Sequence, residues 1–82
     1  MVEVRFDKKF SSVFSKIKDL SLKKKIAKQI KKVSENPKVG KPMRNVRKGT
    51  RELYVRPFRL SYVYLGEEDL VYVFGIYHKK GQ

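Results

Sequence analysis

The segment from residue 51 to residue 80, RELYVRPFRLSYVYLGEEDLVYVFGIYHKK, combines strand-forming residues with side chains that bind phosphate or carry protons. It holds Arg51, Arg56, Arg59 and the only histidine of the chain, His78. Guanidinium groups bind phosphate through a two-pronged fork, and imidazole titrates near neutral pH. Like charges repel, so strands that collect them need a reason. Either the charges keep a sheet soluble, or a phosphate chain lies across that sheet.

The alternation of residue types in 58-FRLSYVYL-65 predicts which side chains share a face of the sheet. The bulky apolar set is expected to pack on helices: Phe58, Leu60, Tyr62 and Tyr64. The opposite set is Arg59, Ser61, Val63 and Leu65. In the preceding strand, Leu53 and Val55 are expected in the core. The side chains that then join Arg59 on the free face are Glu52, Tyr54 and Arg56.

A free face with arginine and tyrosine suits a polyanion, because tyrosine rings stack on nucleobases while guanidinium groups hold phosphates. A solvated face whose arginines prevent aggregation explains the same pattern. The last strand is less clear, since residues 70–74 are apolar on both faces, as in a central strand. Simple alternation places His78 with Phe74 and Ile76. A bulge at Gly75 reverses that placement, so the face of His78 stays open.

The segments before residue 51 supply the expected helices. Residues 2–6 alternate as a short strand, Asp7 is a candidate N-cap for one helix, and Ser21 for the next. Two apolar stripes with helical spacing follow these caps: Phe10, Val13, Phe14, Ile17 and Leu20, then Leu22, Ile26, Ile30 and Val33. The sequence Asn36-Pro37 ends the second helix. Residues 36–50, with two prolines and two glycines, are predicted to form a long loop.

These elements predict an α+β fold of order β-α-α-β-β-β. Its helix hairpin packs on one face of a mainly antiparallel, four-stranded sheet. With 82 residues and no repeats, the chain is expected to form a single domain over residues 1–82.

The composition narrows the function further. Twenty-one Lys and Arg face eight Asp and Glu, for a net charge of +13, which attracts polyanions such as nucleic acid or an acidic partner. The absence of cysteine excludes disulfides, thiolate nucleophiles and cysteine-based zinc sites. No apolar run is long enough to span a membrane, and the start lacks the apolar stretch of a signal peptide. A cytoplasmic protein without membrane contact is therefore expected.

The ordered set NP-VGKP after the second helix, then RELYV, FRLSYVY and a closing YHKK, resembles the RelE/ParE superfamily of toxins from type II toxin–antitoxin pairs. The resemblance covers nearly the whole chain. It implies a toxin that inhibits translation as a ribosome-dependent endoribonuclease, cutting messenger RNA in the A site. The ribose 2′-hydroxyl attacks the adjacent phosphate, without metal or other cofactor.

The resemblance also implies roles for single residues. Arg59 matches the arginine of the middle strand, which stabilises charge on the phosphate. His78 matches the C-terminal histidine of the YoeB branch and is expected to protonate the leaving oxygen. Met43 stands where YoeB has its general base, a glutamate, and Tyr54 and Glu52 stand where RelE has two lysines. Glu52 is the replacement base if it faces Arg59; otherwise it forms a surface salt bridge, and the catalytic set is partial.

Basic and aromatic residues near this set are expected to contact RNA or the ribosome. They are Arg44, Arg47, Lys48, Arg51, Tyr54, Arg56, Tyr77, Lys79 and Lys80. For Tyr77 a core position is the competing reading. The lysines of the second helix are read either as a solvated face or as a surface for ribosomal RNA or antitoxin.

The expected partner is a short acidic antitoxin, and a toxin–antitoxin heterotetramer is compatible with that pairing. Other functions remain open, one of them a small nucleic-acid chaperone without any toxin role. Met43 in place of the base is compatible with a degenerate protein that binds RNA or antitoxin without cleavage. A gyrase inhibitor of the ParE branch is another alternative. The sequence does not fix codon preference, the antitoxin or the oligomeric state.

Overall fold

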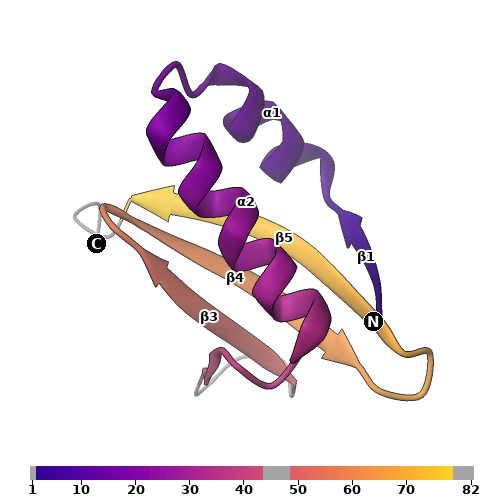
Figure 1. Cartoon of the computed structure of the whole chain (residues 1–82). Helices are drawn as coiled ribbons and strands as arrows, with labels where there is room; N and C mark the ends of the chain where they lie inside the picture. The colour runs from indigo at the N-terminus through magenta and orange to yellow at the C-terminus, as the bar shows by residue number, and fades with distance from the viewer. Residues whose placement is uncertain (1, 44–48, 79–82) are drawn as a thin grey trace.

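The computed structural model describes residues 2–43 and 49–78, which form two helices and a mixed sheet. The elements in chain order are β1 (Glu3–Phe6), α1 (Lys8–Lys16), α2 (Leu20–Glu35), β2 (Lys41–Pro42), β3 (Thr50–Val55), β4 (Phe58–Leu65) and β5 (Leu70–His78). Both helices lie on one face of the sheet, with α2 crossing its middle (Figure 1). The α+β class and the helix layer on one sheet face confirm the predicted fold.

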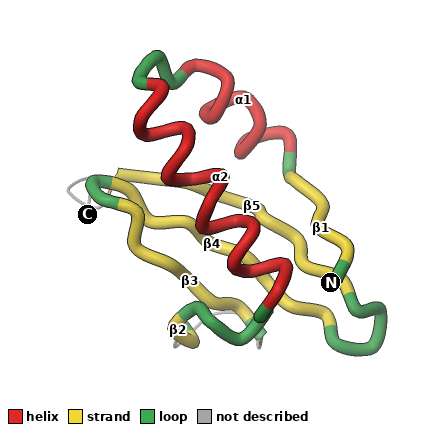
Figure 2. The backbone as a smooth tube through the Cα atoms, viewed as in Figure 1, coloured by secondary structure: helices red, strands yellow, loops and turns green. Residues whose placement is uncertain are grey.

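The sheet has five strands in the order β1-β5-β4-β3-β2, so β4 lies in its centre. β1 runs parallel to β5, and the other neighbours are antiparallel. The prediction of four strands is wrong by one short strand. The segment predicted as a loop turns back beside β3, where Lys41 pairs with Glu52 and Pro42 with Arg51 (Figure 2).

Aspartate side chains begin both helices. Asp7 Oδ2 accepts from the Lys9 amide at 3.0 Å, as its predicted N-cap role requires. α2 is capped by Asp19, whose Oδ1 accepts from the amides of Ser21 and Leu22 at 2.9 and 3.2 Å. The prediction of Ser21 as the cap is therefore wrong, because a carboxylate two residues earlier already serves those amides.

This earlier start changes the apolar stripe of α1. Leu20 was predicted for the stripe of the first helix but is the first residue of α2 and is 72% exposed, and Val13 of that stripe is also exposed. At the other end α2 stops at Glu35, with Asn36 as its C-cap and Pro37 next, as predicted.

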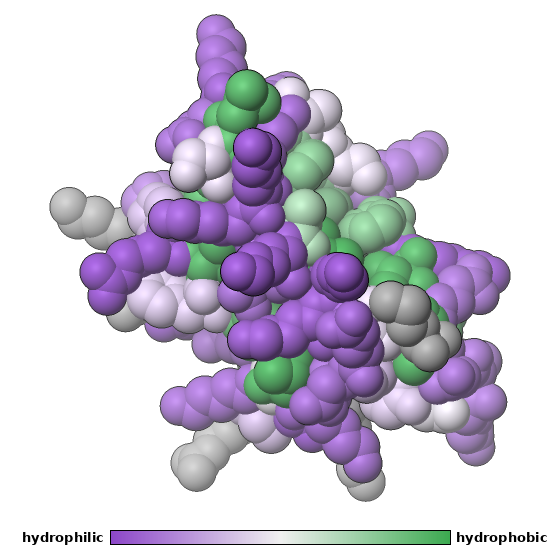
Figure 3. Space-filling model, in the orientation of Figure 1, coloured by the Kyte–Doolittle hydropathy of each residue, from purple (hydrophilic) through white to green (hydrophobic). Residues whose placement is uncertain are grey.

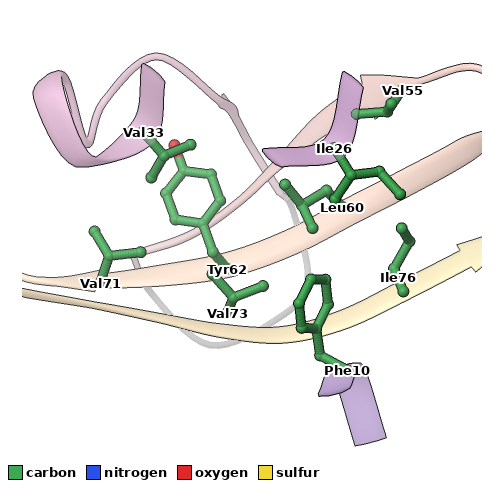
Figure 4. Packing of buried hydrophobic residues seen from close by; sticks show 9 residues of the cluster. All are labelled: Phe10, Ile26, Val33, Val55, Leu60, Tyr62, Val71, Val73 and Ile76. Carbon is green, nitrogen blue, oxygen red and sulfur yellow. The ribbon is translucent and has the colours of Figure 1, made fainter. Parts of the chain in front are cut away.

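The core lies between α2, α1 and the helix-side face of the sheet (Figure 4). Its buried members are Phe10, Ile26, Val33, Val55, Leu60, Tyr62, Val71, Val73 and Ile76. Leu60 and Tyr62 are fully buried, and Phe58 and Tyr64 pack against the same cluster. The predicted helix-side face of β4 is thereby confirmed.

Tyr62 is the polar member of this core, and its hydroxyl is satisfied by the backbone before β2. It donates to the Pro37 carbonyl at 2.7 Å and accepts from the Gly40 amide at 2.9 Å. Arg51 adds bonds from Nη1 to the carbonyls of Lys38 and Gly40 at 3.0 and 2.7 Å. Gly40 must lack a side chain, because a Cβ would lie 2.6 Å from the Tyr62 hydroxyl. Burial raises the pKa of Tyr62, so this phenol stays protonated.

β5 contains an irregularity that decides which of its residues share a face. Val73 pairs with Tyr62 and Ile76 with Leu60, and both are buried. The register shifts between Ser61 and Tyr62, so that one extra residue, Phe74, is accommodated beside the Gly75–Ser61 pair.

We expect Tyr62→Phe to lower the free energy of unfolding by about 1–3 kcal/mol, because it leaves a partly buried carbonyl and a buried amide without their partner. Urea denaturation measures the change. Tyr64→Phe is the matched control, since it removes only an exposed bond to Asp69. Equal stability of the two variants would contradict the structural role of the Tyr62 hydroxyl.

A pH effect is expected from the bond between Tyr72 Oη and Asp7 Oδ1, at 2.5 Å. This bond, and then the bond from the Lys9 amide, lowers the pKa of Asp7 in the folded state. A lowered pKa contributes stability above the unfolded value of about 3.9, and that contribution is lost as the pH falls through the folded pKa. Tyr72→Phe should therefore raise the pKa of Asp7, measured by NMR of its carboxyl carbon, and lessen the loss of stability on acidification. An unchanged Asp7 titration contradicts this.

Candidate functional site on the helix-free face of the sheet

The face of the sheet opposite the helices, here called the helix-free face, brings together residues from β3, β4 and β5. In one cross-strand row, Tyr54 pairs with Arg59, and Arg59 with Tyr77. In the next row, Glu52 pairs with Ser61, and Ser61 with Gly75. Leu60 and Tyr62 point into the core, so Ser61 between them and Arg59 just before Leu60 point to the helix-free face.

Four of these residues form one connected polar cluster. Ser61 Oγ donates to the Tyr77 hydroxyl at 3.3 Å, and that hydroxyl donates to Glu52 Oε2 at 3.2 Å. The other carboxylate oxygen of Glu52 lies 3.7 Å from Arg59 Nη1. The chain of donors thus runs from Ser61 through Tyr77 to a carboxylate that faces a guanidinium group.

The cluster has the chemical parts of a metal-free site. The carboxylate of Glu52 can accept a proton, the phenol of Tyr77 can donate one, and Arg59 can stabilise developing negative charge. At 3.7 Å the Glu52–Arg59 pair is looser than a direct charge-assisted hydrogen bond of about 2.7–2.9 Å, so donors of Arg59 remain for a phosphate. The side chains of Arg59 and Glu52 keep 28% and 22% exposure, which leaves both reachable.

Tyr54 and Arg56 flank the cluster on the edge side of β3. Tyr54 is 50% exposed, and the Arg56 guanidinium lies 5.9 Å from the centre of its ring. An exposed ring beside an arginine suits contact with a nucleotide. This placement is the one that the alternation of β3 predicts.

His78 and Arg51 lie apart from the cluster. His78 pairs with Phe58, and their rings meet edge to face at 5.2 Å, so the β5 irregularity sends this exposed histidine to the helix side. Arg51 pairs with Tyr62, and its guanidinium binds backbone carbonyls. The structure therefore does not bring either residue together with Arg59.

Five residues predicted to contact RNA lie outside the described part of the chain: Arg44, Arg47, Lys48, Lys79 and Lys80. Sequence reasoning missed Ser61 as a partner of Tyr77, and it missed Phe74 on the helix-free face. The ambiguity noted at Gly75 was the only signal for the latter. Within residues 2–43 and 49–78, no three acidic or histidine side chains gather in a way that suits a metal ion. No helix in this part of the chain is long and apolar enough to cross a membrane.

Comparison with known proteins adds a family and a fold. The model for the ParE toxin of the type II toxin–antitoxin system parDE matches residues 4–82. The intact RelBE toxin–antitoxin complex of E. coli contains a similar chain, with a TM-score of 0.81 at 20% identity, covering 93% of this chain and 94% of that one. The isolated E. coli RelE toxin gives 0.83 at 18% identity, covering 95% and 84%.

The RelBE2 toxin–antitoxin complex of Mycobacterium tuberculosis also contains a similar chain, with a TM-score of 0.78 at 25% identity, covering 95% of this chain and 98% of that one. A search of curated proteins finds no match.

The geometry predicts that Arg59 contributes little to folding. Its ion pair is long and partly exposed, so Arg59→Ala should change the free energy of unfolding by less than about 1 kcal/mol. Urea denaturation measures this, with Leu60→Ala as the control for a buried neighbour, where a loss of about 2–5 kcal/mol is expected. A comparable loss in both variants would assign Arg59 a structural role.

Proposed function

The chain belongs to the family of ParE toxins of type II toxin–antitoxin systems, and we propose that it is a metal-independent endoribonuclease that cleaves messenger RNA on the ribosome. Membership confirms the resemblance to the RelE/ParE superfamily that the sequence indicated. The observation that supports the ribonuclease is the cluster of Glu52, Arg59, Ser61 and Tyr77 on the helix-free face.

In the proposed reaction, the 2′-hydroxyl of the RNA attacks the adjacent phosphorus. Glu52 accepts the proton of that hydroxyl as the O2′–P bond forms. Arg59 binds the phosphate oxygens and stabilises the charge that grows on them. The P–O5′ bond breaks, and Tyr77 donates its proton to the leaving oxygen. The products are a 2′,3′-cyclic phosphate and a 5′-hydroxyl.

The hydrogen bond between Tyr77 and Glu52 provides a path that returns the transferred proton after each reaction. After cleavage, Glu52 holds an extra proton and Tyr77 lacks one, and their oxygens are 3.2 Å apart. Direct transfer restores both groups, with Ser61 supporting the phenolate by its bond at 3.3 Å. No metal is needed for this cycle, and the carboxylate absent at Met43 is supplied by Glu52.

This assignment departs from the expectation that His78 is the acid. Tyr77 is preferred because it lies in the same cross-strand row as Arg59, whereas His78 packs on Phe58 at the helix side. Tyr54 and Arg56 are proposed to hold flanking nucleotides. Arg51, tied to the backbone, supports the fold and is not assigned to RNA.

The proposed partner is a short acidic antitoxin that acts on the helix side. Two features support this location. The exposed surface over α2 is largely hydrophilic (Figure 3), and no lysine of α2 forms an ion pair within the described residues. Beside it, an apolar groove of about 330 Å³ accepts hydrophobic side chains and is lined by Phe6, Phe10, Ser11, Phe14, Ala27 and Ile30.

Gyrase inhibition is the second candidate function, because the family model that matches the chain describes ParE toxins. A toxin of that kind needs no proton transfer at Glu52 and Tyr77. The two functions therefore differ in how they depend on the cluster, and the same variants separate them.

We expect induced expression of the wild type to arrest growth and to produce new 5′ ends in translated messenger RNA, detected by primer extension. Arg59→Ala and Tyr77→Phe should each lower the cleavage rate at least about 100-fold, as is usual for charge stabilisation and general acid–base groups. His78→Ala is the matched control, next to Tyr77 but on the other face, and should keep most of the activity.

Loss of cleavage in His78→Ala together with full activity in Tyr77→Phe would return the acid role to the histidine. Growth arrest without new 5′ ends, accompanied by inhibited DNA supercoiling in a gyrase assay, contradicts the ribonuclease and supports the second function. Binding to ribosomes with neither effect identifies a protein without catalytic activity.

A further inference from the structure

The irregularity of β5 places the apolar side chain of Phe74 on the helix-free face, whose central residues are otherwise polar. Val73 and Ile76 both point to the core, so Phe74 and Gly75 between them lie opposite Ser61 on the helix-free face. Phe74 is 36% exposed and does not belong to the buried core, although its neighbour Val73 is only 1% exposed.

Phe74 belongs to a group of exposed aromatic side chains on the helix-free face. Of the six large hydrophobic side chains exposed in the described part of the chain, three are aromatic residues of this face: Tyr54, Phe74 and Tyr77. Single exposed apolar residues need no explanation, but three exposed rings on β3 and β5, the strands on either side of Arg59, form a patch with a chemical character. Exposed rings next to a group that binds phosphate match what single-stranded RNA offers.

Gly75 leaves open space at its own Cβ position, next to Phe74 in the chain. Apart from its two chain neighbours, no atom of the described residues lies within 4 Å of a Cβ built at Gly75. Ser61, which Gly75 pairs with, is 2% exposed and is occupied by its bond to Tyr77. The described residues therefore leave room for a ligand over the Gly75 backbone, beside the partly exposed Phe74.

We infer that Phe74 forms a base-stacking subsite for the nucleotide next to the phosphate held by Arg59. Arg59 pairs with Tyr77, so its diagonal neighbour is Gly75, at a Cα separation of roughly 7–8 Å, and Phe74 is the next residue along β5. A separation a little larger than this suits a phosphate and the base of an adjoining nucleotide. The ligand is a nucleobase of single-stranded RNA, and every base is accepted because each has a π face. This inference rests on the proposed function for its ligand and goes beyond it in naming the subsite.

The test uses a messenger RNA in which 2-aminopurine replaces the base on either side of the cleaved bond. A 2′-deoxyribose at the attacking position prevents cleavage. The probe is titrated with the protein both free and in the A site of programmed ribosomes. Stacking on an aromatic ring lowers 2-aminopurine fluorescence, so we expect the wild type to quench one of the two positions.

Variants then identify the ring responsible. Phe74→Ala should abolish the quench and weaken binding roughly tenfold or more. Phe74→Tyr should keep both. The Cβ of Gly75→Val meets no described residue within 4 Å other than its chain neighbours, so this variant should keep the melting temperature while blocking the quench. Phe6→Ala is the control for loss of an exposed phenyl, because Phe6 lies at the groove on the helix side and is 44% exposed.

The inference is wrong if the wild type quenches neither position in either setting, or if Phe74→Ala quenches as the wild type does. Primer extension on unmodified messenger RNA is run in parallel. Cleavage without quenching overturns the stacking subsite alone. Quenching that depends on Phe74, without any cleavage, retains the subsite and contradicts the proposed ribonuclease.

Discussion

The strict two-residue alternation of β4 is the constraint on which the candidate site depends. Leu60 and Tyr62 are fully buried beneath α2, and a one-residue slip would expose both and bury a guanidinium group. The free energy of that burial therefore fixes the direction of Arg59 and Ser61, although neither contributes to the core. The Tyr62 hydroxyl tightens the constraint, because it fits only where the backbone at Pro37 and Gly40 satisfies it. The site is thus positioned by residues on the opposite face of the same strand.

β5 obeys a different constraint, and the difference shapes the site. Its core positions Val71, Val73 and Ile76 are not all two residues apart, so a regular strand cannot bury the last of them with the first two. The extra residue, Phe74, resolves this conflict, and the residues of β5 that follow it point to the opposite faces from those that regular alternation would give them. Tyr77 consequently reaches Glu52 and Arg59, while His78 turns to Phe58. A packing requirement in the core therefore selects which proton-carrying side chain faces the guanidinium.

How far the sequence predicts the site depends on how regularly each strand alternates. In β3 and β4 the alternation is regular, so Leu53, Val55, Leu60 and Tyr62 were predicted for the helix side correctly, and Glu52 with Arg59 for the other. In β5 the residues are apolar on both faces, and only three-dimensional packing decides where the irregularity lies.

The local sequence signals for the two helix N-caps also differed in how clearly they identified the capping residue. Asp7 was recognisable as a cap because nothing competes with it, whereas Ser21 lost to Asp19, a stronger acceptor two residues earlier. The bond between Tyr77 and Glu52 joins residues 25 positions apart, and no local pattern encodes such a contact. The short strand β2 has the same origin, since it exists only because β3 lies beside it.

For the proposed ribonuclease, the distribution of charge separates the capture of RNA from the chemistry. The chain carries a net charge of +13, yet the described cluster pairs one guanidinium with one carboxylate and adds no net charge. The long-range attraction for a polyanion must then come from residues outside the cluster, including the lysines of α2. A carboxylate near a phosphate is repelled by it, and a strongly positive surrounding field offsets that repulsion. The attraction should fall steeply with salt, because it arises from counterion release, whereas stacking and proton transfer within the cluster depend on contact and should not.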